Sequence, residues 1–96
     1  MIILDLKEKL LIHTEITVKV SQPLTEIHKR YLECLANNSW ISISELKKYV
    51  YGKNSHNIFD SIVKDNIRML QDTYNLDIAV ANTNKYKLNN IISVGD

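Results

Sequence analysis

The chain has 96 residues, 45% of them hydrophobic, and a net charge of only +1. This length and composition predict a single globular domain and exclude a disordered chain. A strongly basic chain would favour nucleic-acid binding by its charge alone, and this chain lacks that charge.

The sequence also bears on the compartment in which the protein works. No apolar run approaches the roughly 18 residues of a membrane span, and residues 1–5 lack the features of a signal peptide. The single cysteine, Cys34, cannot form an internal disulfide, which agrees with a reducing compartment. We therefore expect a cytoplasmic protein without membrane contact.

A small antiparallel sheet is expected in residues 1–20. Three strands are predicted there: one around the alternating residues Ile2, Leu4 and Leu6, one at residues 10–12, and one at residues 16–20. In the last strand Val18 and Val20 alternate with polar neighbours, which predicts one buried and one exposed face. Residues 21–23 are expected to end that strand.

The first helix is expected to begin at the N-cap Thr25 and to run to about Leu35, with residues 37–39 ending it. Its predicted core-facing residues are Ile27, Tyr31, Cys34 and Leu35. Trp40, which follows the helix, is interpreted as a core anchor.

A second helix is indicated by Ser42 and Glu45, which have the spacing of a capping box, and Gly52 is placed to stop it. Its predicted apolar side consists of Ile43, Leu46, Tyr49 and Val50. Lys47 and Lys48 are expected to sit in water.

The longest amphipathic pattern lies in the last third of the chain, where a third helix is predicted. Its apolar stripe, at spacings of three and four, consists of Phe59, Ile62, Val63, Ile67, Leu70 and Tyr74. Its opposite face carries Ser61, Lys64, Arg68, Gln71 and Asp72. A hairpin follows, with Leu76, Ile78 and Val80 on the first strand, residues 82–84 in the turn, and Tyr86 and Leu88 on the second. Such a helix can enter a DNA major groove while the ribbon contacts phosphates.

Catalytic and metal chemistry find little support in the sequence. His13, His28 and His56 lie on different predicted elements, with no cysteine or carboxylate cluster at ligand spacing. Gly52 and Gly95 are the only glycines, too few for a glycine-rich phosphate loop. No nucleophile and base are paired in a recognisable way. We therefore expect a protein that is not an enzyme, with no catalytic residue, metal or cofactor.

Several groups of residues stand at positions typical of one protein family. They are Leu24 and Thr25 with Tyr31, Leu32, Glu33 and Leu35; residues 42–46 with Val50, Tyr51 and Gly52; Val63, Ile67, Arg68 and Leu70; and Tyr86, Lys87 and Leu88. In these positions the chain resembles the effector domain of the OmpR/PhoB family of response regulators in bacterial two-component systems. The resemblance implies an α+β winged helix-turn-helix domain over residues 1–96. Its parts are an N-terminal sheet at 1–20, a three-helix core at 24–74 and a C-terminal hairpin wing at 76–89.

The resemblance also implies a function, which is sequence-specific binding of double-stranded DNA in transcription regulation. The base-reading residues it implies are Asn66, Arg68 and Gln71, and the phosphate-contacting residues are Lys64, Lys85 and Lys87. The loop of Lys53, Asn54, Ser55 and His56 matches a family loop that touches RNA polymerase. A homodimer on tandem half-sites is a further implied assembly. The chain would be either an excised effector domain or a small stand-alone regulator.

The chain departs from the family pattern at His28, Tyr51 and Lys85, and it has Met69 and Gln71 where arginines are common. Acidic residues also lie near the third helix, so the predicted DNA surface is nearly neutral. This leaves a second interpretation open: an adaptor with a winged-helix fold that contacts RNA polymerase or another regulator and has lost DNA binding. On that interpretation Arg68 is a solvated helix residue, and the hairpin lysines only protect a strand edge.

Overall fold

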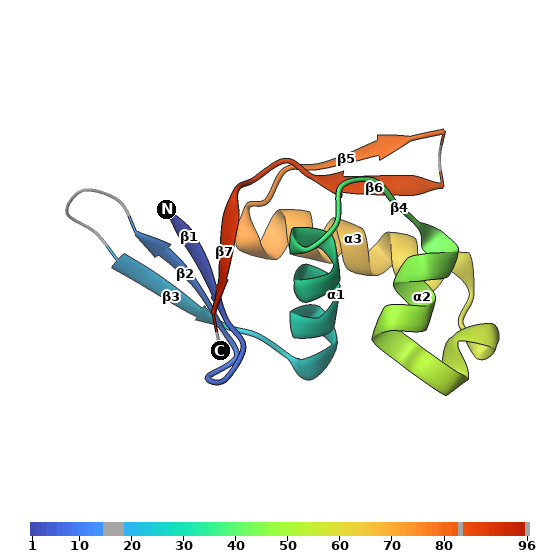
Figure 1. Ribbon diagram of the computed structural model, residues 1–96, viewed down its shortest axis with the longest axis horizontal. Coiled ribbons are helices and arrows are strands. Elements are labelled where there is room, and N and C mark those ends of the chain that lie inside the picture. Colours follow the sequence, from blue (N-terminus) through green and yellow to red (C-terminus); the bar gives the residue numbers. More distant parts are fainter. Residues whose placement is uncertain (15–18, 83, 96) are drawn as a thin grey trace.

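The structure is a computed structural model that describes residues 1–14, 19–82 and 84–95. Within these residues the chain has an α+β fold with three α-helices, a short 3-10 helix and seven strands in two sheets (Figure 1). The helices are α1 (Glu26–Ala36), α2 (Ile43–Tyr51), η1 (Gly52–Asn57) and α3 (Asp60–Tyr74). The strands are β1 (Ile2–Asp5), β2 (Leu10–Thr14), β3 (Lys19–Pro23), β4 (Ile41–Ser42), β5 (Ile78–Ala81), β6 (Lys85–Leu88) and β7 (Ile92–Gly95).

The first sheet has the strand order β3-β2-β1-β7. β2 pairs antiparallel with β1 and with β3, but β7 pairs parallel with β1. The prediction of a purely antiparallel N-terminal sheet is therefore wrong, because the C-terminal segment returns to join it. A four-residue strand whose partner lies some ninety positions away leaves too weak a pattern to be recognised in the sequence.

Strand β3 also differs from its prediction. It continues through Pro23, so residues 21–23 belong to the strand and do not end it, while the predicted start at residues 16–18 lies outside the described residues. Val20 was expected on a buried face and is 50% exposed. The reason is that β3 is the outermost strand of the sheet and contributes no buried residue to the core. An edge strand also tolerates a proline, which has no N–H to donate.

Local signals set the ends of α1 and α2 as predicted. The hydroxyl of Thr25 accepts a hydrogen bond from the His28 backbone N–H at 3.0 Å, which confirms Thr25 as the N-cap of α1. Ser42 Oγ accepts from the Glu45 N–H at 3.2 Å, which confirms Ser42 as the N-cap of α2. The Glu45 carboxylate accepts from the Ser42 hydroxyl at 2.9 Å and not from the Ser42 backbone N–H, so the reciprocal half of the predicted capping box is not formed. Gly52 ends α2 with a φ of +56°, a conformation that favours glycine.

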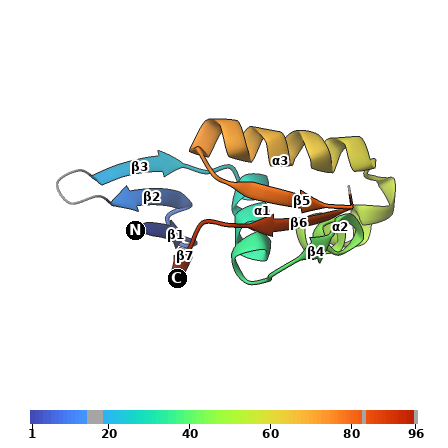
Figure 2. The same cartoon turned by 90° about the horizontal axis from the view of Figure 1, so that it is seen from above.

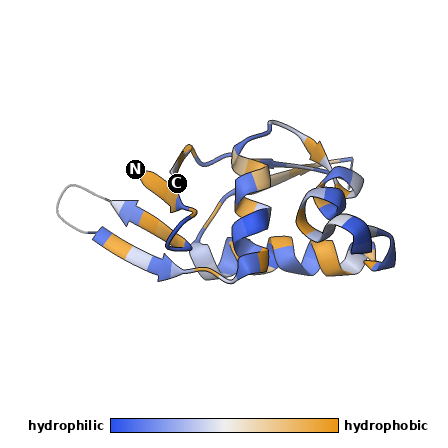
Figure 3. Cartoon of the chain, turned by 60° about the horizontal axis from the view of Figure 1, so that its bottom comes forward, coloured by the Kyte–Doolittle hydropathy of each residue, from blue (hydrophilic) through white to orange (hydrophobic). Residues whose placement is uncertain are grey.

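The core is continuous across both sheets and all three α-helices. Its fully buried side chains include Leu4, Leu11, Tyr31, Leu32, Leu35, Leu46, Val50, Val63 and Leu70. Along α3 the buried residues are Val63, Ile67, Leu70 and Tyr74. Figure 3, in which α3 is the long helix along the bottom, shows this alternation as hydrophobic and hydrophilic segments succeeding one another. Most of the predicted apolar stripe is therefore confirmed.

Two residues of that stripe were placed wrongly. Phe59 is 75% exposed and Ile62 is 38% exposed. Phe59 precedes the helix as its N-cap. Ile62 lies about 100° around the helix from Val63, at the flank of the buried face. Neither side chain is part of the buried core.

Two further predictions of burial are wrong, since Trp40 and Tyr49 are 45% and 46% exposed. Val80, two residues after the buried Ile78 on β5, is 58% exposed. Trp40 lies against the outer face of the second sheet, where the Lys87 ammonium is 5.9 Å from its ring centroid. Tyr49 turns toward α1 and donates a hydrogen bond to the Glu33 carboxylate. Lys47, predicted to sit in water, instead forms an ion pair with Asp60 and has a side chain only 18% exposed.

The second sheet holds the C-terminal hairpin against α3. Its order is β4-β6-β5, and β5 and β6 pair antiparallel, with Val80 opposite Tyr86. Tyr86 and Leu88 lie on the returning strand, as predicted, and both are buried. Gln71 Nε2 donates to the Ile78 carbonyl at 3.0 Å. Figure 2 shows α3 running alongside β5 and β6. No helix in the described part of the chain is both long and apolar enough to cross a membrane.

Candidate nucleic-acid interface

The outward surface of α3 carries two cations whose side chains reach solvent. Lys64 and Arg68 are one turn apart and both are exposed. With the buried Ile67 and the polar Gln71 they form one wall of a hollow of about 300 Å³, and Val80 and Tyr86 of the hairpin form the other. We call this the α3–hairpin groove. Its apolar base and cationic rim suit a ligand that presents negative charge at its edge.

Gln71 has an internal role in the groove. Its amide nitrogen donates to the Ile78 carbonyl and so ties α3 to β5. The bond fixes the orientation of the amide, which keeps one N–H and its carbonyl oxygen for a base contact.

Asn66 lies apart from the groove. It is separated from Arg68 by roughly 160° around the helix and does not line the hollow. Its amide nitrogen donates to the Ile62 carbonyl of its own helix at 2.9 Å. The three predicted base readers therefore do not form one surface, and Arg68 alone combines exposure with a place on the groove.

The hairpin lysines lie on the side of the sheet that faces away from α3. Successive side chains of a strand point to opposite faces, so Lys85 and Lys87 lie opposite the buried Tyr86 and Leu88. Lys85 is exposed at the start of β6, whereas Lys87 is half-buried over the Trp40 ring. Lys85 is thus the freer of the two for a phosphate.

The predicted polymerase-contact loop is the 3-10 helix η1. Lys53, Asn54 and His56 are exposed there, and Ser55 is half-buried. η1 lies between α2 and the first turn of α3, where Lys47 on α2 and Asp60 on α3 form an ion pair at 2.5 Å. The Lys47 ammonium holds the pKa of Asp60 below its ordinary value, with a smaller contribution from Lys64. The pair links the first turn of α3 to α2 at the surface of the protein.

Lys48, which was expected only to be solvated, shares a hollow with η1 residues. A sequence signal for this cluster existed, because residues 46–59 contain three lysines and no acidic residue.

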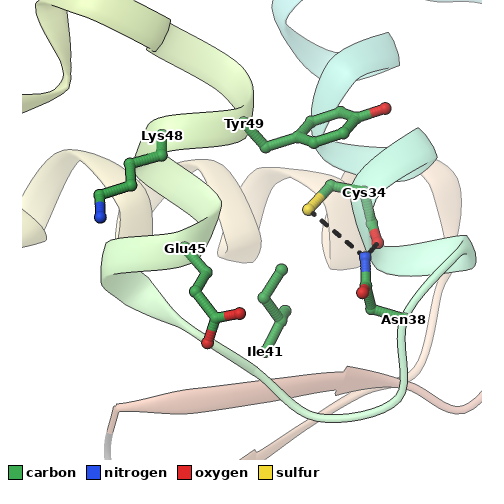
Figure 4. A pocket seen from close by; sticks show the side chains of 6 residues that line it. All are labelled: Cys34, Asn38, Ile41, Glu45, Lys48 and Tyr49. Atoms are coloured by element: carbon green, nitrogen blue, oxygen red, sulfur yellow. Dashed lines mark hydrogen bonds between the residues drawn. The ribbon is translucent and has the colours of Figure 1, made fainter.

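A second hollow, of about 420 Å³, lies between α1 and α2 (Figure 4). It is lined by Cys34, Asn38, Ile41, Glu45, Lys48 and Tyr49. Burial raises the pKa of the Cys34 thiol to about 11 and that of Tyr49 to about 12. Both groups are protonated at neutral pH, and Asn38 donates a hydrogen bond to the Cys34 carbonyl at 2.7 Å. Cys34 is a buried hydrophobic residue, as predicted.

The described residues contain no group of three or more histidine, cysteine or acidic side chains that could hold a metal ion.

Comparison of the chain with protein-family models, with curated proteins and with solved structures gave no match. Its function therefore has to be inferred from its own residues and their geometry.

Proposed function

We propose that the protein is a winged-helix DNA-binding module that regulates transcription, similar to the effector domain of an OmpR/PhoB response regulator. In this proposal α3 is the recognition helix and the β5–β6 hairpin is the wing. The observation that carries it is the α3–hairpin groove, where Lys64 and Arg68 stand exposed beside a hairpin docked on the same helix.

The dimensions of α3 support this proposal. Its 15 residues make it about 22 Å long at 1.5 Å per residue. A B-DNA major groove, about 12 Å wide, accepts a helix of this kind. Arg68 is the base-reading candidate because its planar guanidinium can pair with the two acceptors of guanine. Lys64 and Lys85 are the phosphate-contacting candidates, and such contacts fix register without reading sequence.

The remaining predicted contacts stay predictions. Lys87 would have to leave Trp40 to reach a phosphate, and the amides of Asn66 and Gln71 are each oriented by a hydrogen bond to a backbone carbonyl. Contact of Lys53, Asn54, Ser55 and His56 with RNA polymerase, and a homodimer on tandem half-sites, are likewise proposed from the family resemblance alone.

Substitutions that separate base recognition from phosphate contact test the proposal. A preferred duplex is first selected from a random pool. Arg68→Ala should then lose roughly 1–3 kcal/mol on that duplex and discriminate less between sequences. Lys85→Ala should weaken all duplexes alike and make the salt dependence shallower by about one unit of slope.

Lys7→Ala is the matched control, because Lys7 is an exposed lysine of the turn between β1 and β2. It should bind as the parent does. If the two test variants, still folded by circular dichroism, also bind like the parent, α3 and the wing are not the DNA surface.

A second candidate function is supported by a different observation on α3. Phe59, Ile62 and Met69 are 75%, 38% and 49% exposed and follow one another along a flank of the helix. Exposed apolar residues grouped in this way mark protein-docking surfaces. If the folded parent does not bind duplex DNA even at low salt, an adaptor that docks a protein on this flank becomes the better account.

A further inference from the structure

Positive charge is concentrated in one short segment of the chain. Residues 46–59 carry Lys47, Lys48 and Lys53 and no aspartate or glutamate, which gives the segment a charge of +3. The whole chain has a net charge of +1, so the other 82 residues sum to +1 − 3 = −2. The segment covers most of α2 and all of η1. The most basic part of the protein is therefore not the recognition-helix candidate α3.

Two of these cations, Lys47 and Lys48, line an open hollow whose other lining residues are two serines and a histidine. Ser44, Lys47 and Lys48 lie at positions i, i+3 and i+4 of α2 and so share one face. With Ser55 and His56 of η1 they enclose about 270 Å³. No carboxylate lines this space. We call it the α2–η1 hollow.

The charge in the hollow is only partly compensated. Asp60 pairs with the Lys47 ammonium. Among the described residues, Lys48 and Lys53 form no ion pair. Lysine ammonium groups, serine hydroxyls and histidine are the side chains that bind phosphate oxygens through charge-assisted hydrogen bonds. The hollow thus offers several donors with at least one uncompensated cation at its rim.

We propose that the α2–η1 hollow binds a phosphate group, and that on duplex DNA it holds a phosphate of the backbone. The position of the hollow argues for DNA as the source. Figures 1 and 2 both place η1, the first turn of α3 and the Ala81 end of β5 at the same end of the molecule. The Lys47–Asp60 pair joins α2 to α3, and the Ile43 N–H donates to the Asn84 carbonyl at 3.0 Å, which joins α2 to the hairpin.

The DNA part of the inference requires that a duplex lying on α3 pass beside the hollow. It therefore rests on the proposed function, whereas phosphate binding itself does not. The experiment therefore has two arms, of which the first uses no DNA.

In the first arm the ¹⁵N-labelled protein is titrated with inorganic phosphate at neutral pH, against sodium chloride at equal ionic strength. The backbone amide signals of Ser44, Ser55 and His56 should shift and saturate with phosphate only. Lys48→Gln should weaken this binding roughly tenfold, since it removes a charged donor. Lys7→Gln should leave it unchanged. Equal shifts with chloride, or an unchanged titration of Lys48→Gln, would overturn the inference.

In the second arm the same variants bind duplex DNA at a series of salt concentrations. Lys48→Gln should make the slope of log K against log salt shallower by about one, because one phosphate contact is lost. Lys7→Gln should keep the parent slope. Inorganic phosphate could bind while Lys48→Gln keeps the parent's slope on DNA. That result would overturn the DNA backbone as the source of the phosphate group and leave a hollow that binds free phosphate.

The two proposals fail in different ways. A parent that binds duplex DNA but not inorganic phosphate contradicts the phosphate site and leaves the proposed function intact. A parent that binds phosphate but no duplex contradicts the proposed function and the DNA part of this inference, and supports the phosphate site alone.

Discussion

Among the described residues His28 is the buried polar residue of the core, and its contacts show how one side chain links three elements. Its Nδ1 lies 3.1 Å from the Tyr74 hydroxyl, and the two rings meet edge to face. The Tyr74 hydroxyl in turn donates to the Pro23 carbonyl at 3.4 Å. The end of β3, the first turn of α1 and the last turn of α3 are thus held together by one chain of hydrogen bonds.

Burial lowers the pKa of His28 below its ordinary value. In the unfolded chain the imidazole takes up a proton near its ordinary pKa of about 6.5, so below that pH the unfolded state binds more protons than the folded state. The stability contributed by the neutral imidazole is therefore complete above about pH 6.5. It is lost as the pH falls toward the lower folded-state pKa.

We therefore expect the free energy of unfolding, measured with urea between pH 5 and pH 7, to rise with pH in the parent. The rise should be smaller in His28→Asn, which has no imidazole to titrate there. The control is His56→Gln, which removes an exposed imidazole on η1 and should keep the parent's pH dependence. An equal rise in His28→Asn and the parent would mean that His28 is not the titrating group.

For the candidate site residues, the sequence predicted which side chains are exposed better than it predicted which residues they contact. Helical periodicity placed Lys64 and Arg68 on the outward face, and both are exposed there. Periodicity could not show that Gln71 bonds to Ile78, because that bond depends on where the hairpin docks. Nor could it show that Lys87 meets Trp40, which is far away in the chain.

At the scale of elements, boundaries set by local chemistry were predictable. Thr25, Ser42 and Gly52 mark the ends of α1 and α2 because each acts on backbone groups only a few residues away. Elements that depend on distant partners were missed. The two-residue β4 exists only by pairing with β6, and β7 exists only by pairing with β1.

Apolar residues outside the core were the other source of error. Hydrophobicity marks Phe59 and Val80 as candidates for burial, but burial needs a neighbour that covers the side chain. Phe59 stands before the first turn of α3, and Val80 lies at the rim of the α3–hairpin groove, where both remain open to solvent. Such positions depend on the packing of whole elements, which the spacing of apolar residues does not specify.

The buried face of α3 leads to a direct prediction of stability. Leu70 is completely buried in the core, so Leu70→Ala should leave a cavity and lower the free energy of unfolding by roughly 2–5 kcal/mol. The adjacent Met69 is 49% exposed, and Met69→Ala should change stability by less than about 0.5 kcal/mol. Urea denaturation of both variants checks the pair. Equal effects would contradict the orientation of α3.

At the scale of the whole molecule, the cations divide into paired and unpaired sets. Lys9, Lys29 and Arg30 converge on the Glu26 carboxylate at 2.9 to 3.3 Å. The hydrogen bonds from Lys9 and Lys29 lower the pKa of Glu26 to about 2. In contrast, the cations Lys48, Lys53, Lys64, Arg68 and Lys85 form no ion pair among the described residues.

This division gives a nearly neutral protein one end that can attract an anion. Lys48, Lys53, Lys64, Arg68 and Lys85 lie on α2, η1, α3 and β6, the elements that surround the two hollows proposed as contacts, whereas Lys7 and Lys19, also unpaired in the described part of the chain, belong to the first sheet and its turn. The first sheet lies toward the other end of the molecule (Figure 1) and is tied to the last turn of α3 by a hydrogen bond from Gln22 to the Thr73 carbonyl at 3.2 Å. The net charge does not reveal this arrangement, because it counts paired and unpaired cations alike.

The most direct test of the central claim is the affinity of the intact chain for duplex DNA over a range of salt concentrations. Lys48, Lys64 and Lys85 offer about three phosphate contacts, so log K should fall with log salt at a slope of roughly −3. Binding should be weak, because few cations line the surface. Absence of binding at low salt, or an affinity that does not change with salt, would contradict the account.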